Sequence, residues 1–284
     1  MKNETNIAKE WHGHALKIKQ DANKIILGQE KAINLVIISL FARGHVLLEG
    51  GVGVGKTTLL QVITKLIGGT YERVEGTVDL MPNDIIYHAS ISSEGKPSIS
   101  KGPLLKKGED LSIFFFNEIN RARPQVHSLL LRVMAEKSVS AFNKVNYLPN
   151  MVVFADRNQV EKNETFELPA AARDRFMMEV SIQSPTDKVL RNSIIFDTKF
   201  QDTSMLIDNI PSPSFDCKEL NEVSSAIQEN IQTSDHIKNY IESLWQATEN
   251  PKKFAVDLEG IDMEDFLVAG SSPRGMIMLI KAAK

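Results

Sequence analysis

Eight residues from Gly50 to Thr57 read Gly-Gly-Val-Gly-Val-Gly-Lys-Thr, which matches the phosphate-binding loop G-x-x-x-x-G-K-S/T. Glycines let the backbone curl so that successive N–H groups face negative charge. The Lys56 ammonium can then reach the β- and γ-phosphates, and the Thr57 hydroxyl can ligate Mg²⁺. The loop predicts that this protein binds a nucleoside triphosphate. The predicted binding residues are Gly50, Gly51, Val52, Gly53, Val54, Gly55, Lys56, Thr57 and Thr58.

The segments on either side of the loop fit this interpretation. Residues 45–49 form a short apolar run suited to a buried parallel strand, and residues 58–67 carry apolar side chains at helical spacing. Strand, glycine loop and helix is the arrangement that a phosphate site requires. A plain structural glycine turn is the alternative, and the context favours the phosphate site.

Two polar residues follow other apolar runs and can take part in hydrolysis. Glu118 comes after 111–116, where a carboxylate can polarise the attacking water. Asn158 comes after 151–155, where an amide can hydrogen-bond the γ-phosphate or the water. The alternative for Glu118 is a solvated carboxylate at a strand end, and the alternative for Asn158 is an amide that caps a turn.

Three arginines can supply positive charge to the phosphates. Arg173 and Arg175 flank Asp174, and either can act as a cationic finger in a neighbouring subunit's site. A surface ion pair is the alternative of similar weight. Arg274 begins a helix after Pro273 and can reach the same phosphates.

The elements that must position these residues alternate between strand and helix. Strands are expected at 45–49, 70–75, 111–116, 151–155 and 177–182, and helices at 29–41, at 58–67 and from Pro124. The alternation predicts a doubly wound parallel sheet, which binds ligands beyond the carboxyl ends of its strands. Gly50, Glu118 and Asn158 should therefore meet at one edge. Residues 87–102 are expected to form a hairpin or an insertion, and residues 138–148 a second hairpin.

The strand signal ends near residue 184, and the remaining segments, such as 218–229 and 234–248, have helical patterns. We therefore expect a nucleotide-binding core over 1–184, including an N-terminal helical segment, and a small helical lid domain over 185–284. The chain ends soon after Arg274, so the lid is expected to be small or truncated.

Composition narrows the class of protein. A chain of 284 residues with 42% apolar and 24% charged residues is typical of a globular protein. A net charge of −3 gives no overall reason to bind nucleic acid, and the single cysteine, Cys217, suits a reducing cytoplasm. The first 24 residues are polar rather than signal-like, and no membrane segment is expected. His12 and His14 there read as a solvated tail.

The ordered set of motifs resembles the AAA+ ATPase superfamily, and within it the MoxR family. The similarity runs from Gly28 to about Val180 and returns at 270–274. It rests on the stretches 44–50, 118–122 (Glu-Ile-Asn-Arg-Ala), 168–171 (Leu-Pro-Ala-Ala) and 174–176 (Asp-Arg-Phe).

The resemblance implies a P-loop α/β fold with a five-stranded parallel sheet and a helical lid. It implies that Glu118 is the catalytic base, Asn158 the first sensor, Arg175 the finger and Arg274 the second sensor. It also implies nucleotide contacts at Gly28 and Gln29, with ATP and Mg²⁺ as ligands. Members resemble one another in forming hexameric rings that remodel or mature protein clients, often with a von Willebrand factor A-domain partner.

One residue and one short segment depart from the family pattern. Members usually carry Asp before the catalytic Glu, where this chain has Asn117; an amide oxygen can still accept from the Mg²⁺ shell but brings no charge. The first-sensor segment reads Asp156-Arg157-Asn158-Gln159 where a Thr-Gln-Asn-Pro-like run is usual, which puts a charged pair near the phosphates. Thr57 and Asn117 are the predicted metal residues.

Three functions remain open on these grounds. The first is an ATP-hydrolysing motor subunit that assembles into a ring and acts on a protein client. The second, motivated by Asn117, is a nucleotide-dependent binding module or switch with weak or no hydrolysis. The third, a nucleic-acid remodeller, is disfavoured by the acidic balance.

Overall fold

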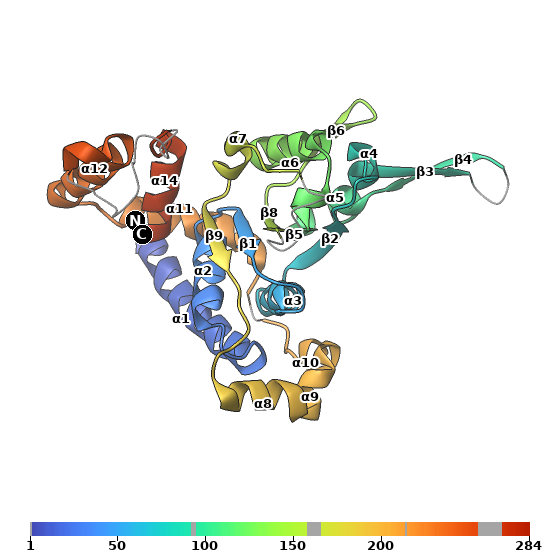
Figure 1. The fold of residues 1–284 in the computed structure, drawn as a ribbon, viewed down its shortest axis with the longest axis horizontal. Helices are drawn as coiled ribbons and strands as arrows, with labels where there is room; N and C mark the ends of the chain where they lie inside the picture. The colour runs from blue at the N-terminus through green and yellow to red at the C-terminus, as the bar shows by residue number, and fades with distance from the viewer. Residues whose placement is uncertain (1, 92–94, 158–165, 214, 255–268) are drawn as a thin grey trace.

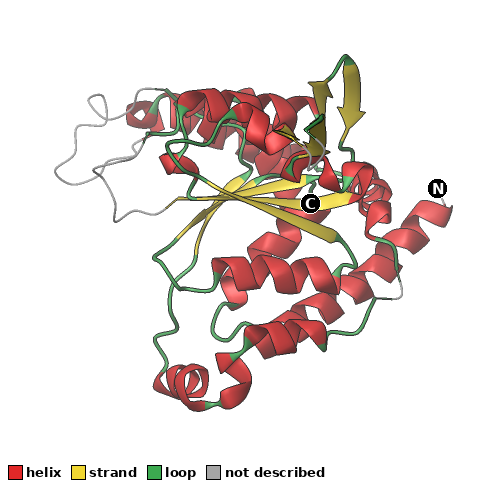
Figure 2. Cartoon of the chain, turned by 90° about the vertical axis from the view of Figure 1, so that its right-hand side faces the viewer, coloured by secondary structure: helices red, strands yellow, loops and turns green. Residues whose placement is uncertain are grey.

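A five-stranded parallel sheet forms the centre of the protein. We describe a computed structural model over residues 2–91, 95–157, 166–213, 215–254 and 269–284. The sheet consists of β1 (Val46–Glu49), β2 (Thr70–Glu75), β5 (Leu111–Asn117), β8 (Val152–Arg157) and β9 (Met178–Ser181). Their order across the sheet is β2-β5-β8-β1-β9, and every neighbouring pair is parallel. Helices cover both faces of the sheet (Figure 2). The expected fold class is confirmed.

Burial on both faces explains why the three inner strands, β1, β5 and β8, have sequences dominated by apolar residues. Successive side chains of β5 enter opposite cores: Ile113 and Phe115 pack on one side, Phe114 and Phe116 on the other. All four are fully buried. The strand cannot tolerate polar alternation, because neither of its faces meets water.

The helices connect the strands, and the longer ones supply the two cores. The α-helices of the first part of the chain are α1 (Lys2–Ile25), α2 (Glu30–Phe41), α3 (Lys56–Leu66), α4 (Pro82–Ile86), α5 (Pro103–Lys106), α6 (Pro124–Glu136) and α7 (Ala170–Arg173). Those that follow β9 are α8 (Lys188–Phe196), α9 (Thr198–Gln201), α10 (Thr203–Asp208), α11 (Leu220–Asn230), α12 (Asp235–Glu249) and α14 (Pro273–Ala283). Proline begins α6 as expected, because an N–H in the first turn of a helix has no acceptor within the helix and its absence in proline costs nothing.

Two hairpins extend from the core where the sequence indicates them. Strands β3 (Tyr87–Ile91) and β4 (Pro97–Lys101) form one antiparallel pair, and β6 (Ser138–Ala141) and β7 (Lys144–Tyr147) form the other. The first hairpin projects far from the sheet (Figure 1).

The N-terminal segment is a packed helix, so the interpretation of His12 and His14 as a solvated tail is wrong for His14. Trp11 on α1 is only 2% exposed and packs against Phe41 of α2 and against Phe215. The His14 ring lies 4.5 Å from the Phe215 ring, centre to centre. The apolar positions Trp11, Ile18 and Ala22 recur at helical spacing, which is the signal that the polar composition hides.

The helices after β9 do not form one group: α8 to α10 lie at the lower end of the molecule in Figure 1, and α12 and α14 lie at the upper left. Helix α11 packs on α1 and α2, and its Leu220 and Val223 belong to the same hydrophobic core as the central sheet. Helix α14 contacts α11 through a hydrogen bond from Gln228 to the Lys281 carbonyl. The division of the chain at residues 184 and 185 into core and lid stays a prediction. Within the described ranges, no helix combines the length and apolar character needed to cross a bilayer.

Candidate nucleotide site

The glycine loop lies at the carboxyl end of β1 and leads directly into α3. Gly53 (φ +76°) and Gly55 (φ +90°) adopt the left-handed conformation that glycine reaches without strain, and Gly55 caps the helix. A Cβ at either position would meet no atom of the described residues within 4 Å, so the backbone there faces open space within the described structure. Open space above backbone N–H groups at a helix N-terminus fits a phosphate group.

Gly50 meets a different constraint. A Cβ on Gly50 would lie 2.3 Å from the carbonyl oxygen of Ile182, which follows β9. The N–H of Ile182 in turn donates to the Glu49 carbonyl at 2.7 Å. The start of the loop is therefore pressed against the end of the neighbouring strand, and only glycine fits.

Lys56 is held inside the site by two partners. Its Nζ donates to the Gly50 carbonyl at 2.8 Å and forms an ion pair with Asp156 Oδ2 at 2.5 Å. The side chains of Lys56 and Asp156 are 10% and 1% exposed. The loop lysine is thus positioned next to the place where phosphates would bind, and its charge is balanced by a buried carboxylate.

Asp156 also connects the loop to Glu118. Its Oδ1 accepts a hydrogen bond from the backbone N–H of Glu118. Burial raises the pKa of the Asp156 carboxyl, whereas the Lys56 ammonium and the Glu118 N–H act in the opposite direction. Asp156 is therefore the central polar group of this edge of the sheet.

Glu118 occupies an uncommon backbone conformation for a residue with a side chain. Its φ and ψ are 52° and 51°, the left-handed region, whose strain costs about 1–3 kcal/mol. Its carboxylate accepts a hydrogen bond from Arg121 Nη1 at 2.7 Å, and its side chain is 20% exposed. Such strain at the end of a buried strand is typical of functional positions.

Asn117, the last residue of β5, contacts a carboxylate on the neighbouring strand. Its Nδ2 donates to Glu75 Oε1 at the end of β2. Glu75 also pairs with Arg73 at 2.5 Å and is 47% exposed. Because the amide nitrogen is engaged with Glu75, the amide oxygen is the atom that Asn117 can offer to a cation.

Arg157 lies at the site's edge but is engaged with the sheet itself. Its guanidinium pairs with Glu49 at 2.9 Å and with Glu179 at 2.7 Å. These contacts join the ends of β8 and β1 to the second residue of β9. The adjacent charges Asp156 and Arg157 therefore have separate partners and do not neutralise each other.

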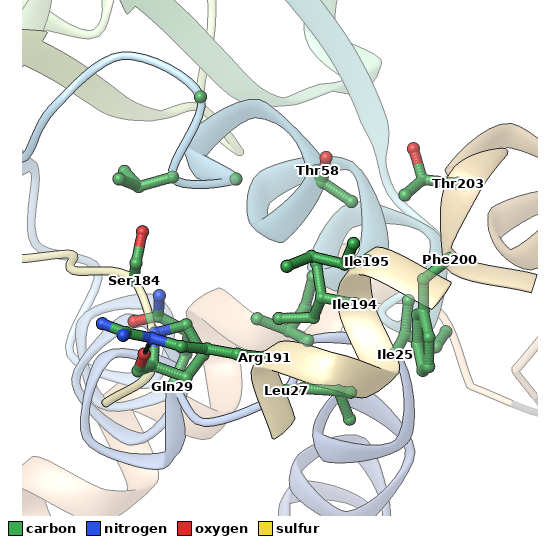
Figure 3. A pocket seen from close by; sticks show the side chains of 15 residues that line it. Ile25, Leu27, Gln29, Thr58, Ser184, Arg191, Ile194, Ile195, Phe200 and Thr203 are labelled. Carbon is green, nitrogen blue, oxygen red and sulfur yellow. Dashed lines mark hydrogen bonds between the residues drawn. The ribbon is translucent and has the colours of Figure 1, made fainter. Parts of the chain in front are cut away.

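A cavity of about 560 Å³ opens beside the loop and fits the base and ribose of a nucleotide (Figure 3). One wall comes from the end of α1 and the turn after it: Ile25, Ile26, Leu27 and Gln29. The loop side contributes Gly53, Val54, Gly55 and Thr58. The opposite wall consists of Ser184, Pro185, Arg191, Ile194, Ile195, Phe200 and Thr203.

Of the two residues expected before the loop, Gln29 lines the cavity and Gly28 supports it from the side. Gln29 Nε2 donates to the Gln183 carbonyl, and Gly28 (φ +70°) lies so close to Pro185 that a Cβ would approach it to 2.9 Å. Sequence reasoning missed the remaining wall. The apolar triplet 25–27 before Gly28 is a usable signal, whereas nothing in residues 184–203 points to a ligand.

The three arginine candidates are absent from the lining of this cavity, and the first of them, Arg173, is the last residue of α7. Arg175 follows α7 at the amino end of β9, and its Nη1 donates to the Ala171 carbonyl at 2.9 Å. Arg274 at the start of α14 pairs with Asp174 at 2.8 Å, next to Arg175. In Figure 1, α7 and α14 lie at the upper end of the molecule and α8 to α10 at the lower end. Asn158 falls outside the described residues.

Oxygen ligands that suit Mg²⁺ are present at Thr57 and Asn117. Among the described residues, no three His, Cys, Asp or Glu side chains cluster as metal ligands. The hydroxyl of Thr57 and the amide oxygen of Asn117 are hard donors that suit Mg²⁺ when phosphate oxygens complete its shell. The donor set fits a cation that arrives with a nucleotide.

Comparison with known proteins agrees with this geometry. Residues 45–178 match the model of the ATPase family associated with various cellular activities (AAA). The crystal structure of a candidate ATPase from Cytophaga hutchinsonii superposes with a TM-score of 0.80 at 24% identity, over 99% of this chain and 81% of that one.

Sequence relatives extend over nearly the whole chain. Protein MoxR of Methylorubrum extorquens is 50% identical over 97% of this chain and 80% of its own length. Protein MoxR of Paracoccus denitrificans is 47% identical over 99% and 83%. Chaperone MoxR1 of Mycobacterium tuberculosis is 30% identical over 93% and 66%. With half of its residues identical to those of a MoxR protein, and with the loop, sheet order and cavity described above, this chain belongs to the MoxR family of AAA+ ATPases.

Proposed function

We propose that this protein binds ATP together with Mg²⁺ and hydrolyses the γ-phosphate. The observation that carries the proposal is the chain of contacts from Lys56 through Asp156 to the backbone of Glu118. These contacts hold the loop lysine and the backbone of Glu118 at one edge of the sheet, which supports the proposal because phosphoryl transfer depends on positioned groups.

Each group has a role that follows from its chemistry. The N–H groups of the glycine loop and the Lys56 ammonium bind the β- and γ-phosphates and balance their charge. Glu118 orients the attacking water and accepts its proton on a carboxylate oxygen. For this, the carboxylate must leave Arg121, with which it is paired here. Asn158 is proposed to contact the γ-phosphate.

Mg²⁺, held by Thr57 and Asn117 together with phosphate oxygens, would neutralise charge that develops between the phosphates. The apolar cavity beside the loop would hold the adenine ring against Ile194, Ile195 and Phe200. Gln29 and Arg191 lie together in that cavity near Ser184 (Figure 3) and could contact the polar edge of the nucleotide.

The proposed working form is a homo-oligomeric ring, a hexamer by family resemblance. Arg175 acts as the finger and Arg274 as the second sensor, both on the site of the adjacent subunit. The name of the mycobacterial relative, a chaperone, supports remodelling or maturation of a protein client. We further propose a cytoplasmic location, with a von Willebrand factor A-domain protein as partner. Nucleic acid is not expected as a ligand.

Phosphate release by the purified protein tests the hydrolytic role of Glu118. We expect Glu118→Gln to lower the release rate by about 10²–10⁴-fold, because the amide cannot accept the proton. ATP binding should persist in this variant, which calorimetry checks. Equal release by both proteins would remove Glu118 from the mechanism.

A second candidate function is a nucleotide-dependent switch with weak or no turnover. Its support is that Asn117 brings no charge to the metal and is engaged with Glu75, while Glu118 is paired with Arg121. Tight ATP binding without phosphate release at saturating Mg²⁺ would favour the switch. Release that rises in Asn117→Asp would instead identify a slow enzyme.

A further inference from the structure

We propose that Asp156 supplies the carboxylate charge that the Mg²⁺–ATP site lacks at Asn117. The inference rests on the proposed binding of ATP and assigns a role to a residue outside the family's pattern. The two departures from that pattern then compensate each other: the carboxylate that is missing at Asn117, the end of β5, is present at Asp156, near the end of β8. Asp156 acts here as a positioning residue through its charge, and no direct bond to the metal is required.

The position of Asp156 supports this assignment. One carboxylate oxygen contacts Lys56, the residue before Thr57, and the other contacts the N–H of Glu118, the residue after Asn117. Asp156 therefore lies between the two segments that carry the predicted metal residues. Strands β5 and β8 are neighbours in the sheet, and their ends are at the same edge.

Charge balance gives Asp156 a reason to interact with the cation. Lys56 is its ionic partner here, and this lysine is proposed to turn toward the phosphates when ATP binds. Asp156 would then be a buried carboxylate, 1% exposed, without a counter-ion. An unpaired buried charge is strongly unfavourable. A divalent cation that enters with the nucleotide replaces the lost partner, so Mg²⁺ and ATP should bind with strong mutual dependence.

Two neighbouring charged residues are alternatives to this arrangement: Arg157 as a counter-ion for Asp156, and Glu75 as the source of negative charge for the metal. Arg157 is paired with Glu49 and Glu179, so it does not balance Asp156. Glu75 is the rival carboxylate because it contacts Asn117 directly. It is, however, 47% exposed and paired with Arg73, so solvent and the arginine both weaken its field at the site.

Calorimetric titration with ATP, in excess Mg²⁺ and in EDTA, tests the inference without measuring turnover. The quantity of interest is the ratio of the Kd in EDTA to the Kd in Mg²⁺. We expect Asp156→Asn to lower this ratio at least tenfold, mainly because ATP alone binds the variant more tightly once Lys56 has no anionic partner. An unchanged or larger ratio in the variant would overturn the assignment.

Three further proteins make the result specific. Asn117→Asp added to Asp156→Asn should restore the wild-type ratio, because it returns the charge to the end of β5. Glu75→Gln should leave the ratio unchanged, and a loss there instead of in Asp156→Asn would transfer the role to Glu75. Asp156→Thr, which carries the residue usual in the family, replaces Asp156→Asn if that variant folds poorly and should lower the ratio in the same way.

Absence of ATP binding by the wild type in Mg²⁺ would refute the proposed function itself, whereas binding with unaltered ratios refutes only this inference.

Discussion

At the scale of single residues, the site depends on where side chains are missing as much as on where they are present. Gly50 and Gly51 begin the loop side by side, yet they face different surroundings. The missing side chain of Gly50 leaves room for the backbone after β9. At Gly51, the nearest atom of the described residues to the Cβ position is Val54 Cγ1, at 3.9 Å. The two glycines form a matched pair for testing how tightly the loop is packed.

Gly50→Ala should destabilise the nucleotide-free protein by about 1–3 kcal/mol, because the added methyl group overlaps a backbone carbonyl that cannot move alone. Gly51→Ala should change stability by less than about 0.5 kcal/mol, since its methyl group enters ordinary van der Waals contact. Urea unfolding of both variants measures this. An equal loss of unfolding free energy in Gly50→Ala and Gly51→Ala would mean that the loop is not packed tightly against the end of β9.

At the scale of elements, one buried histidine connects three of them. His45 precedes β1, its Nδ1 accepts from the Val153 N–H of β8 at 2.9 Å, and its Nε2 lies 3.2 Å from the Met134 carbonyl of α6. A ring that accepts at Nδ1 and donates at Nε2 is neutral. Burial lowers the pKa of His45 to about 4, although the bond to Met134 acts in the opposite direction.

This lowered pKa makes stability depend on pH in a definite direction. The unfolded state takes up the proton near pH 6.5 and the folded state only near pH 4, so the contribution of neutral His45 is complete above pH 6.5. It is lost as the pH falls from 6.5 to 4, by up to about 3 kcal/mol. The free energy of unfolding, measured for wild type and His45→Gln across this range, should show a smaller pH slope in the variant. Parallel slopes would contradict the assignment.

At the scale of the whole molecule, the parallel sheet places the glycine loop and the proposed arginine finger at opposite ends of neighbouring strands. The glycine loop follows the carboxyl end of β1, whereas Arg175 precedes β9, its parallel neighbour. The four residues of β9 span about 13 Å, and the register pairs Met178 with Val46. Arg175 precedes the amino end of β9, whereas the glycine loop follows the carboxyl end of β1, so the proposed partner of Arg175 is the site of another subunit.

Mixing two inactive variants tests this arrangement. Glu118→Gln subunits keep the finger and Arg175→Ala subunits keep the base, so an interface between them contains one complete site. We expect each variant alone to be impaired at least tenfold and an equal mixture to recover about a quarter of the wild-type phosphate release, as random assembly predicts. Arg173→Ala serves as the matched control because Arg173, the last residue of α7, is exposed two positions before Arg175. Failure of the mixture to recover, while both variants still assemble, would exclude a finger in trans.

Much of the fold follows from local patterns in the sequence. Apolar runs bounded by glycine or polar residues predicted the inner strands β1, β5 and β8, and more polar segments predicted the edge strands β2 and β9. The two hairpins lie where turn residues interrupt weak alternation. The loop from Gly50 to Thr57 and the strand-end position of Glu118 were likewise readable, because each depends on residues adjacent in the chain. The lining of the cavity by residues 184–203 was not, since their exposed apolar side chains carry no mark of a ligand.

The sequence by itself determined the phosphate loop, the parallel α/β core and the family, because these are encoded in short motifs and in the periodicity of burial. Only the tertiary structure decided the partners of the charged residues. Lys56 and Asp156 are 100 positions apart, as are Asp174 and Arg274, and neither pairing has any local signal. Each pair forms because strand order and helix docking bring distant segments together, and that packing places a buried carboxylate where Asn117 offers none.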